Sequence, residues 1–136
     1  MTPSPFLDAN VILRYLLNDL PVQADRAEAL FVRVQRGEAQ VYLPEIALAD
    51  VVWTLHRFYK RNREEIRSAL LPFLGLEGLE MRDKAVAIQA LHLFADRNID
   101  FSDALIAAEM LQTGQAEIYS YDRDFDRIAG IRRVEP

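Results

Sequence analysis

Hydrophobic residues recur at helical spacing along most of the chain. Ala27, Leu30, Phe31 and Val34 fall at i, i+3, i+4 and i+7, which predicts an amphipathic helix closed by Gly37. Asn62, followed three residues later by Glu65, has the pattern of a capped helix start. The same apolar spacing predicts further helices within residues 11–17, 48–58, 66–73, 87–94 and 104–111. In the second of these, the predicted buried stripe consists of Leu48, Val51, Val52, Leu55 and Phe58.

Short extended segments lie between the predicted helices. Residues 4–7, 40–43, 79–81, 117–121 and 131–134 are each predicted to be extended or to form a strand. Strands that alternate with helices imply crossover connections and a mainly parallel sheet with helices on both faces. The predicted fold is therefore an α/β three-layer sandwich. Because no Pro-, Gly- or Ser-rich linker divides the chain, we expect residues 1–136 to form a single domain.

Composition restricts the chemistry that this domain can perform. The chain is 51% hydrophobic and 27% charged, its formal charge is −5, and it has no cysteine and two histidines. Thiolate chemistry is excluded, and a metal would be bound by oxygen atoms. The chain shows no apolar run of membrane-spanning length and no signal-peptide pattern, so we expect a cytoplasmic protein that does not contact a membrane.

Four aspartates occupy positions at which an α/β sheet places its ligands. Asp8 and Asp122 directly follow predicted strands, whereas Asp50 and Asp103 belong to helices expected to leave the same edge. Four carboxylates in one cleft would repel each other unless a divalent cation such as Mg²⁺ or Mn²⁺ joined them. Such a site is suited to phosphoryl chemistry.

Capping is the alternative explanation for each of these acids. A single aspartate beside a helix start is more often a cap than a ligand. Asp8 and Asp122 fit capping least well, because each immediately follows a short apolar strand.

Four segments of the chain resemble the PIN-domain family. They are FLDANVILRYLL, PEIALADVVWTL, DFSDALIAAEM and YSYDRDFDRIAGIRR, and they occur in the order and with the spacing of that family. More narrowly, they resemble the VapC-like toxins of bacterial toxin–antitoxin pairs. By position, the resemblance implies that Asp8, Asp50, Asp103 and Asp122 are the catalytic and metal-binding acids.

The resemblance also assigns supporting residues and shows two departures. Asn10 and Ser120 match residues that help to hold the site, although the family often has threonine in place of Ser120. The central acid is commonly glutamate rather than an aspartate such as Asp50, which leaves Glu45 as an alternative. Asp126 is a candidate for an additional ligand, but it and Asp124 are better explained as exposed turn residues.

The resemblance implies a Mg²⁺- or Mn²⁺-dependent endoribonuclease. It would hydrolyse the RNA phosphodiester so that phosphate remains on the 5′ end of one fragment. It also implies a homodimer held inactive by a cognate antitoxin protein. The particular RNA and the identity of the antitoxin are not encoded in any motif of this sequence.

Basic and aromatic residues offer further contacts to RNA. Lys60, Arg61 and Arg63 belong to a basic strip that either holds RNA phosphates or is a solvated face. Arg14 either contacts phosphate or pairs with a nearby acid such as Asp19. For Trp53, Phe58 and Tyr59, a core or interface position is favoured over base stacking.

Three other functions are less well supported by the sequence than a ribonuclease. An aspartate-nucleophile phosphatase would carry a second aspartate where this chain has Asn10, and a phosphotransfer receiver would carry a lysine after a late strand, where Tyr121 and Asp122 stand. A PIN-like module that binds RNA or protein without cleavage is the remaining alternative. The presence of all four acids argues against it.

Overall fold

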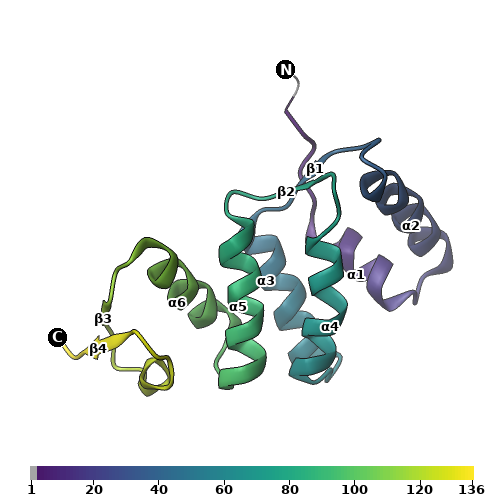
Figure 1. The fold of residues 1–136 in the computed structure, drawn as a ribbon. Coiled ribbons are helices and arrows are strands. Elements are labelled where there is room, and N and C mark those ends of the chain that lie inside the picture. Colours follow the sequence, from purple (N-terminus) through teal and green to yellow (C-terminus); the bar gives the residue numbers. More distant parts are fainter. Residues whose placement is uncertain (1–2) are drawn as a thin grey trace. The chain divides into compact units, whose positions relative to one another are not determined.

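The computed structural model describes residues 3–136, which fall into two compact units. The first extends to Lys84 and the second spans Ala85–Pro136. Figure 1 shows the helices and short strands that make up each unit.

The first unit combines helices with a short parallel pair of strands. Its elements are α1 (Ala9–Leu17), α2 (Pro21–Gln35), β1 (Val41–Tyr42), α3 (Glu45–Trp53), the π-helix η1 (Thr54–Phe58), α4 (Arg63–Leu74) and β2 (Leu79–Glu80). Val41 pairs with Leu79 and Tyr42 with Glu80, and Phe6 forms an isolated parallel bridge to Tyr42. The extended lead predicted at residues 4–7 therefore lies beside β1.

Aromatic packing and a helix cap stabilise this unit. The Phe31 ring lies 4.9 Å from Tyr15 and 5.0 Å from Phe73, measured between ring centroids. Such aromatic pairs add to the free energy gained by burying the rings. The Asn62 side chain accepts from the Glu65 N–H, and the Glu65 side chain accepts from the Asn62 N–H, which confirms the predicted capping box.

The π-helix η1 changes the direction of the side chains that follow α3. The Tyr59 N–H donates to the Thr54 carbonyl over 3.1 Å, an i to i+5 bond. Leu48, Val51 and Leu55 are buried as predicted, but 71% of Phe58 is exposed. The prediction that Phe58 continues the buried stripe is wrong, because the wider π turn rotates it off that face.

The second unit contains two helices and a second parallel strand pair. Its elements are α5 (Lys84–Arg97), α6 (Phe101–Thr113), β3 (Glu117–Tyr119), the 3-10 helix η2 (Arg123–Arg127) and β4 (Arg132–Val134). Strands β3 and β4 pair with Glu117 opposite Arg132. Helix α6 ends at Gly114, whose φ of 80° is the left-handed conformation that favours glycine.

The predicted class, helices alternating with short parallel strands, is confirmed. The strands are shorter than predicted and form two separate pairs, β1 with β2 and β3 with β4. In residues 3–136 no helix has the length and apolar character that crossing a membrane requires.

Candidate metal centre

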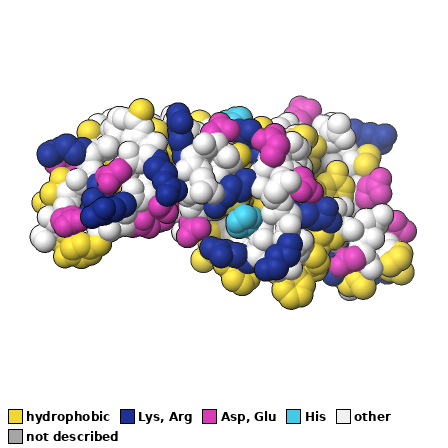
Figure 2. All heavy atoms as spheres, turned by 90° about the horizontal axis from the view of Figure 1, so that it is seen from below, with side chains coloured by type: hydrophobic (Ala, Val, Ile, Leu, Met, Phe, Trp, Pro, Cys, Tyr) yellow, Lys and Arg dark blue, Asp and Glu magenta, His cyan; other side chains and the backbone are white. Residues whose placement is uncertain are grey.

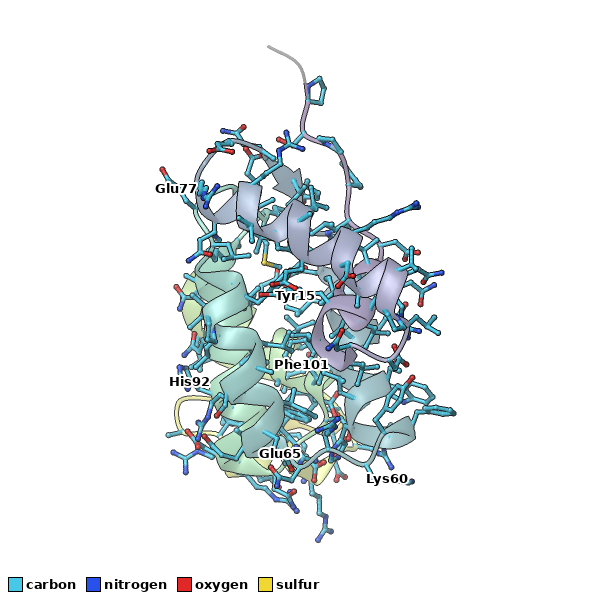
Figure 3. All side chains as sticks on the ribbon, turned by 90° about the vertical axis from the view of Figure 1, so that its right-hand side faces the viewer. Tyr15, Lys60, Glu65, Glu77, His92 and Phe101 are labelled. Carbon is cyan, nitrogen blue, oxygen red and sulfur yellow. The ribbon has the colours of Figure 1, made fainter. Side chains whose placement is uncertain are left out.

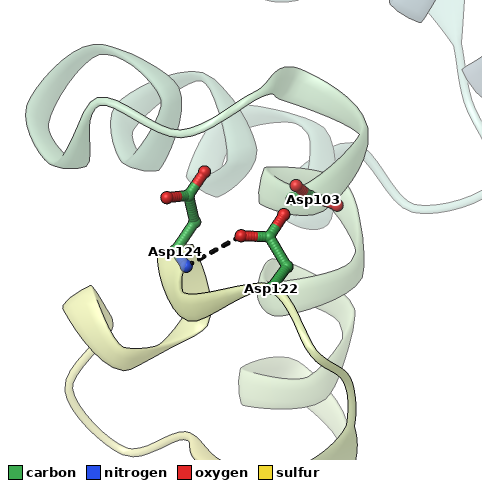
Figure 4. Close-up of side chains that lie close together, drawn as sticks. All are labelled: Asp103, Asp122 and Asp124. Carbon is green, nitrogen blue, oxygen red and sulfur yellow. Dashed lines mark hydrogen bonds between the residues drawn. The ribbon is translucent and has the colours of Figure 1, made fainter.

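Three aspartates of the second unit converge where α6 begins. Asp103 lies in the first turn of α6, Asp122 directly precedes η2, and Asp124 lies within η2. One carboxylate oxygen from each lies within 4.8 Å of the others. Figure 4 shows the three side chains close together. Oxygen atoms at such separations can be ligands of one cation.

Hydrogen bonds fix the loop that carries Asp122. The Ser120 N–H donates to the Val134 carbonyl over 3.1 Å, which ties this residue to the end of β4. The Ser120 hydroxyl then accepts from the Asp122 N–H over 2.9 Å, and Asp122 Oδ1 accepts from the Asp124 N–H over 2.9 Å. Ser120 thus contacts the backbone of Asp122, and its supporting role in a metal site stays a prediction.

The electrostatics of this group favour a cation. Burial, followed by the negative charges of Asp122 and Asp100, raises the pKa of Asp103 from 3.8 to about 6. The metal-free cluster therefore retains a proton to a higher pH than isolated aspartates would. Carboxylates are the ligands that Mg²⁺ and Mn²⁺ prefer, so the donor set fits a divalent cation.

Two of the predicted ligands also cap helices. The Asp8 carboxylate accepts from the Ala9 N–H over 2.8 Å at the start of α1, and Asp122 has the same role for η2. The expectation that these two residues fit capping least well is wrong, because α1 begins directly after Asp8 and η2 directly after Asp122. A carboxylate has about four lone pairs, so capping and metal binding are compatible.

The remaining predicted site residues belong to the first unit. Asp8 and Asn10 are exposed at the start of α1, and Asp50 is exposed on α3. Glu45, the alternative to Asp50, pairs with Arg82 over 3.2 Å. That Asp8 and Asp50 complete the metal site stays a prediction.

Asp124 is the cluster member that the sequence analysis did not select. In the sequence, aspartates occupy every second position at Asp122, Asp124 and Asp126. This spacing alone does not show which of the three can bind a metal. Asp126 instead pairs with Arg133, at 3.1 Å from Nε and 3.3 Å from Nη2. Asp124 also has an arginine partner, Arg127 at 3.4 Å, so the position of its carboxylate beside Asp103 and Asp122, and not the lack of a counter-ion, places it in the cluster.

The candidate RNA-contacting residues all lie in the first unit. Arg14 pairs with Asp19 over 3.3 Å, which agrees with the predicted ion pair and not with the predicted phosphate contact. Arg61 lies 3.8 Å from Glu65, an exposed pair of small energetic effect. Lys60 is exposed with a φ of 57°, and Arg63 is the first residue of α4.

Comparison with known proteins identifies the family of the chain. The PIN domain family matches residues 6–131, so the chain belongs to that family. Within it, the chain is similar to a VapC ribonuclease of Aquifex aeolicus (strain VF5). The two are 25% identical over 130 residues, which cover 96% of this chain and 95% of the relative. The predicted family resemblance is confirmed.

Proposed function

We propose that this protein is a divalent-metal-dependent endoribonuclease that acts as the toxin of a toxin–antitoxin pair. The cluster of Asp103, Asp122 and Asp124 is the observation that carries the proposal, because it offers several carboxylate oxygens to one cation. The membership of the PIN family and the name of the bacterial relative point to the same chemistry. We place this activity in the cytoplasm.

The metal ligands proposed are Asp8, Asp50, Asp103 and Asp122, with Asp124 as a further candidate. Bound Mg²⁺ or Mn²⁺ would supply positive charge that stabilises the phosphoryl oxygens and lowers the pKa of the attacking water. In the overall reaction a water oxygen bonds to phosphorus as the bond to the 3′ oxygen breaks. One product then carries a 5′ phosphate and the other a 3′ hydroxyl.

The protein's own groups orient the donor atoms and control a proton. The Ser120 hydroxyl and the Asp124 N–H hold the Asp122 loop and carboxylate in place. Because its pKa is about 6, Asp103 must lose a proton before it can serve as a charged ligand in mildly acidic solution. Cation binding should therefore release a proton and weaken as the pH falls.

The test is cleavage of mixed cellular RNA by purified, antitoxin-free protein with Mg²⁺ or Mn²⁺. We expect discrete products that disappear with EDTA and fall at least about 100-fold with Asp122→Asn. Asp25→Asn is the matched control, since Asp25 is an exposed acid of α2 outside the cluster. A wild-type protein that binds Mn²⁺ but cuts no RNA would favour the non-cleaving PIN-like module.

The same variants can test the proposed four-acid set. Asp8→Asn and Asp50→Asn should each weaken Mn²⁺ binding and abolish cleavage if those side chains join Asp103 and Asp122. Calorimetric titration with Mn²⁺ measures binding independently of activity. Unchanged Mn²⁺ affinity in both variants would restrict the metal site to the acids of the second unit.

The toxin role requires partners that can be tested separately. We propose a homodimer and a small cognate antitoxin protein that inhibits cleavage. Expression of the wild-type chain alone should arrest growth of a bacterial host, whereas Asp122→Asn should not. Sedimentation equilibrium of the purified protein tests the homodimer, for which a single-chain mass would be the contrary result.

A further inference from the structure

The Arg133 side chain joins three segments around the proposed metal ligands of the second unit. Arg133 belongs to β4, and only 12% of its side chain is exposed. Its Nε and Nη2 donate to the two carboxylate oxygens of Asp126 in η2, over 3.1 and 3.3 Å. Its Nη1 donates to the Ser120 carbonyl oxygen over 3.2 Å and to the Glu135 carboxylate over 2.9 Å. One guanidinium therefore binds the residue after β3, the helix η2 and the segment after β4.

Two of these contacts bracket the residues Asp122 and Asp124. Ser120 precedes Asp122 by two residues, and Asp126 follows Asp124 by two. We call the segment from Ser120 to Asp126 the acid loop, and Arg133 joins its two ends. Within the loop, the Ser120 hydroxyl accepts from the Asp122 N–H, and Asp122 Oδ1 accepts from the Asp124 N–H. A loop held in one conformation loses less binding free energy to conformational entropy when it binds a cation.

Core packing contributes little to the position of Asp122. None of residues 117–124, all of which the structure describes, is buried, and Phe125 is the one buried residue of the acid loop. By contrast, Asp103 lies in the first turn of α6, and Phe101 at the start of that helix is buried (Figure 3). The core therefore sets the position of Asp103, whereas that of Asp122 depends on polar contacts.

The chemistry of Arg133 suits a residue that fixes the acid loop. Its planar guanidinium fork matches the two oxygens of the Asp126 carboxylate, a geometry that lysine does not reproduce. The neighbouring Arg132 pairs with Glu117, but its side chain is 71% exposed, and water weakens such a pair. Figure 2 shows basic side chains beside acidic ones in the left-hand part of the view, which contains β3 and β4. Arg132 is therefore a matched control for Arg133.

We propose that Arg133 is a positioning residue that holds Asp122 and Asp124 where both can bind one cation. It acts through Ser120 and Asp126 rather than by contact with the cation. This inference rests on the proposed metal-dependent function. The competing explanation is that Arg133 only stabilises the fold of the second unit. Its loss would then lower the free energy of unfolding and leave the metal affinity unchanged.

Titration with Mn²⁺, followed by calorimetry, separates these two explanations. Arg133→Gln should weaken Mn²⁺ binding about 10- to 100-fold, the usual effect of losing a residue that orients metal ligands. Arg133→Lys keeps the charge but loses the fork, so it should recover only part of the affinity. Arg132→Gln removes the same charge from the exposed position of β4 and should leave the affinity within about twofold.

A second substitution tests the route through Asp126. Asp126→Asn should also weaken Mn²⁺ binding, and adding it to Arg133→Gln should have little further effect, because both changes break the same pair. If Asp126 were itself a ligand, its loss would weaken binding equally in the Arg133→Gln protein. Arg133→Lys and Asp126→Asn carry the comparison if Arg133→Gln does not fold.

Stability and loop order are measured on the same proteins in EDTA. Asn62→Ala removes the cap of α4 in the first unit, so it shows what a loss of stability alone does to Mn²⁺ affinity. Amide hydrogen exchange, followed by NMR, reports the Asp122 and Asp124 N–H groups that bond within the acid loop. Both should exchange faster in Arg133→Gln than in Arg132→Gln.

The outcomes separate this inference from the proposed function. Weaker Mn²⁺ binding and faster exchange in Arg133→Gln, with Arg132→Gln and Asn62→Ala binding like the wild type, would support it. Arg133 variants that bind Mn²⁺ like the wild type, or that bind it less tightly with unchanged exchange, would overturn the inference alone. Equal losses of affinity in Arg133→Gln and the two controls would do the same. A wild-type protein that binds no Mn²⁺ would refute the proposed function and this inference together.

Discussion

Replacing Asp103 by asparagine should stabilise the metal-free protein while it destroys the metal site. Burial and the charges of Asp122 and Asp100 raise the pKa of Asp103 from 3.8 to about 6. In the folded state Asp103 therefore binds its proton more tightly than in the unfolded state. The stability that this proton contributes is complete below about pH 4 and is lost as the pH rises through about 6.

The magnitude follows from the difference between the two pKa values of Asp103. They differ by about two pH units, which corresponds to about 3 kcal/mol without screening. Because the side chain remains partly exposed, water weakens both the effect of burial and the repulsion, and we expect about 1 kcal/mol. At pH 7.5 in EDTA, Asp103→Asn should unfold with a free energy higher by that amount, whereas at pH 4 it should match the wild type.

Urea unfolding at both pH values, with EDTA or Mn²⁺, is the assay. At a Mn²⁺ concentration 100 times the dissociation constant, the wild type should gain about 2.7 kcal/mol and Asp103→Asn much less. Asp25→Asn serves as the control for loss of one negative charge. If Asp103→Asn were destabilised equally at pH 4 and pH 7.5 in EDTA, the repulsion argument would be refuted.

Mn²⁺ affinity should fall about tenfold for each pH unit well below 6, because Asp103 must release its proton before it binds the cation. Calorimetry in buffers of different ionisation enthalpy would reveal the released proton. A Mn²⁺ affinity that does not change with pH would contradict the role of Asp103. Asn62→Ala should lower the free energy of unfolding by about 1 kcal/mol through loss of the α4 cap, with Asn62→Ser retaining most of it in urea unfolding. Gly78→Ala should cost about 3 kcal/mol or more, because its Cβ would lie 2.1 Å from the Ala39 carbonyl oxygen. Gly75→Ala, whose Cβ would meet only ordinary contacts, is the control, and equal effects of the two would refute the steric argument.

Local patterns in the sequence were sufficient for most of the helices and for the chemical character of the site. The spacing of apolar residues located α2 and α6, and the Asn62–Glu65 pair located the start of α4. These features depend on contacts within one or two turns, which residue spacing determines directly. The family motifs likewise selected Asp103 and Asp122, which the structure brings together.

Contacts between segments were decided only by the tertiary structure. Asp124 and Asp126 have the same local character, yet one joins the acid cluster and the other pairs with Arg133 from β4. Phe58 continues the apolar spacing of α3, but one π turn exposes it. A periodic pattern of residues describes the faces of a regular helix. It does not show where a π turn rotates a side chain such as Phe58, nor that a distant strand supplies the partner of Asp126.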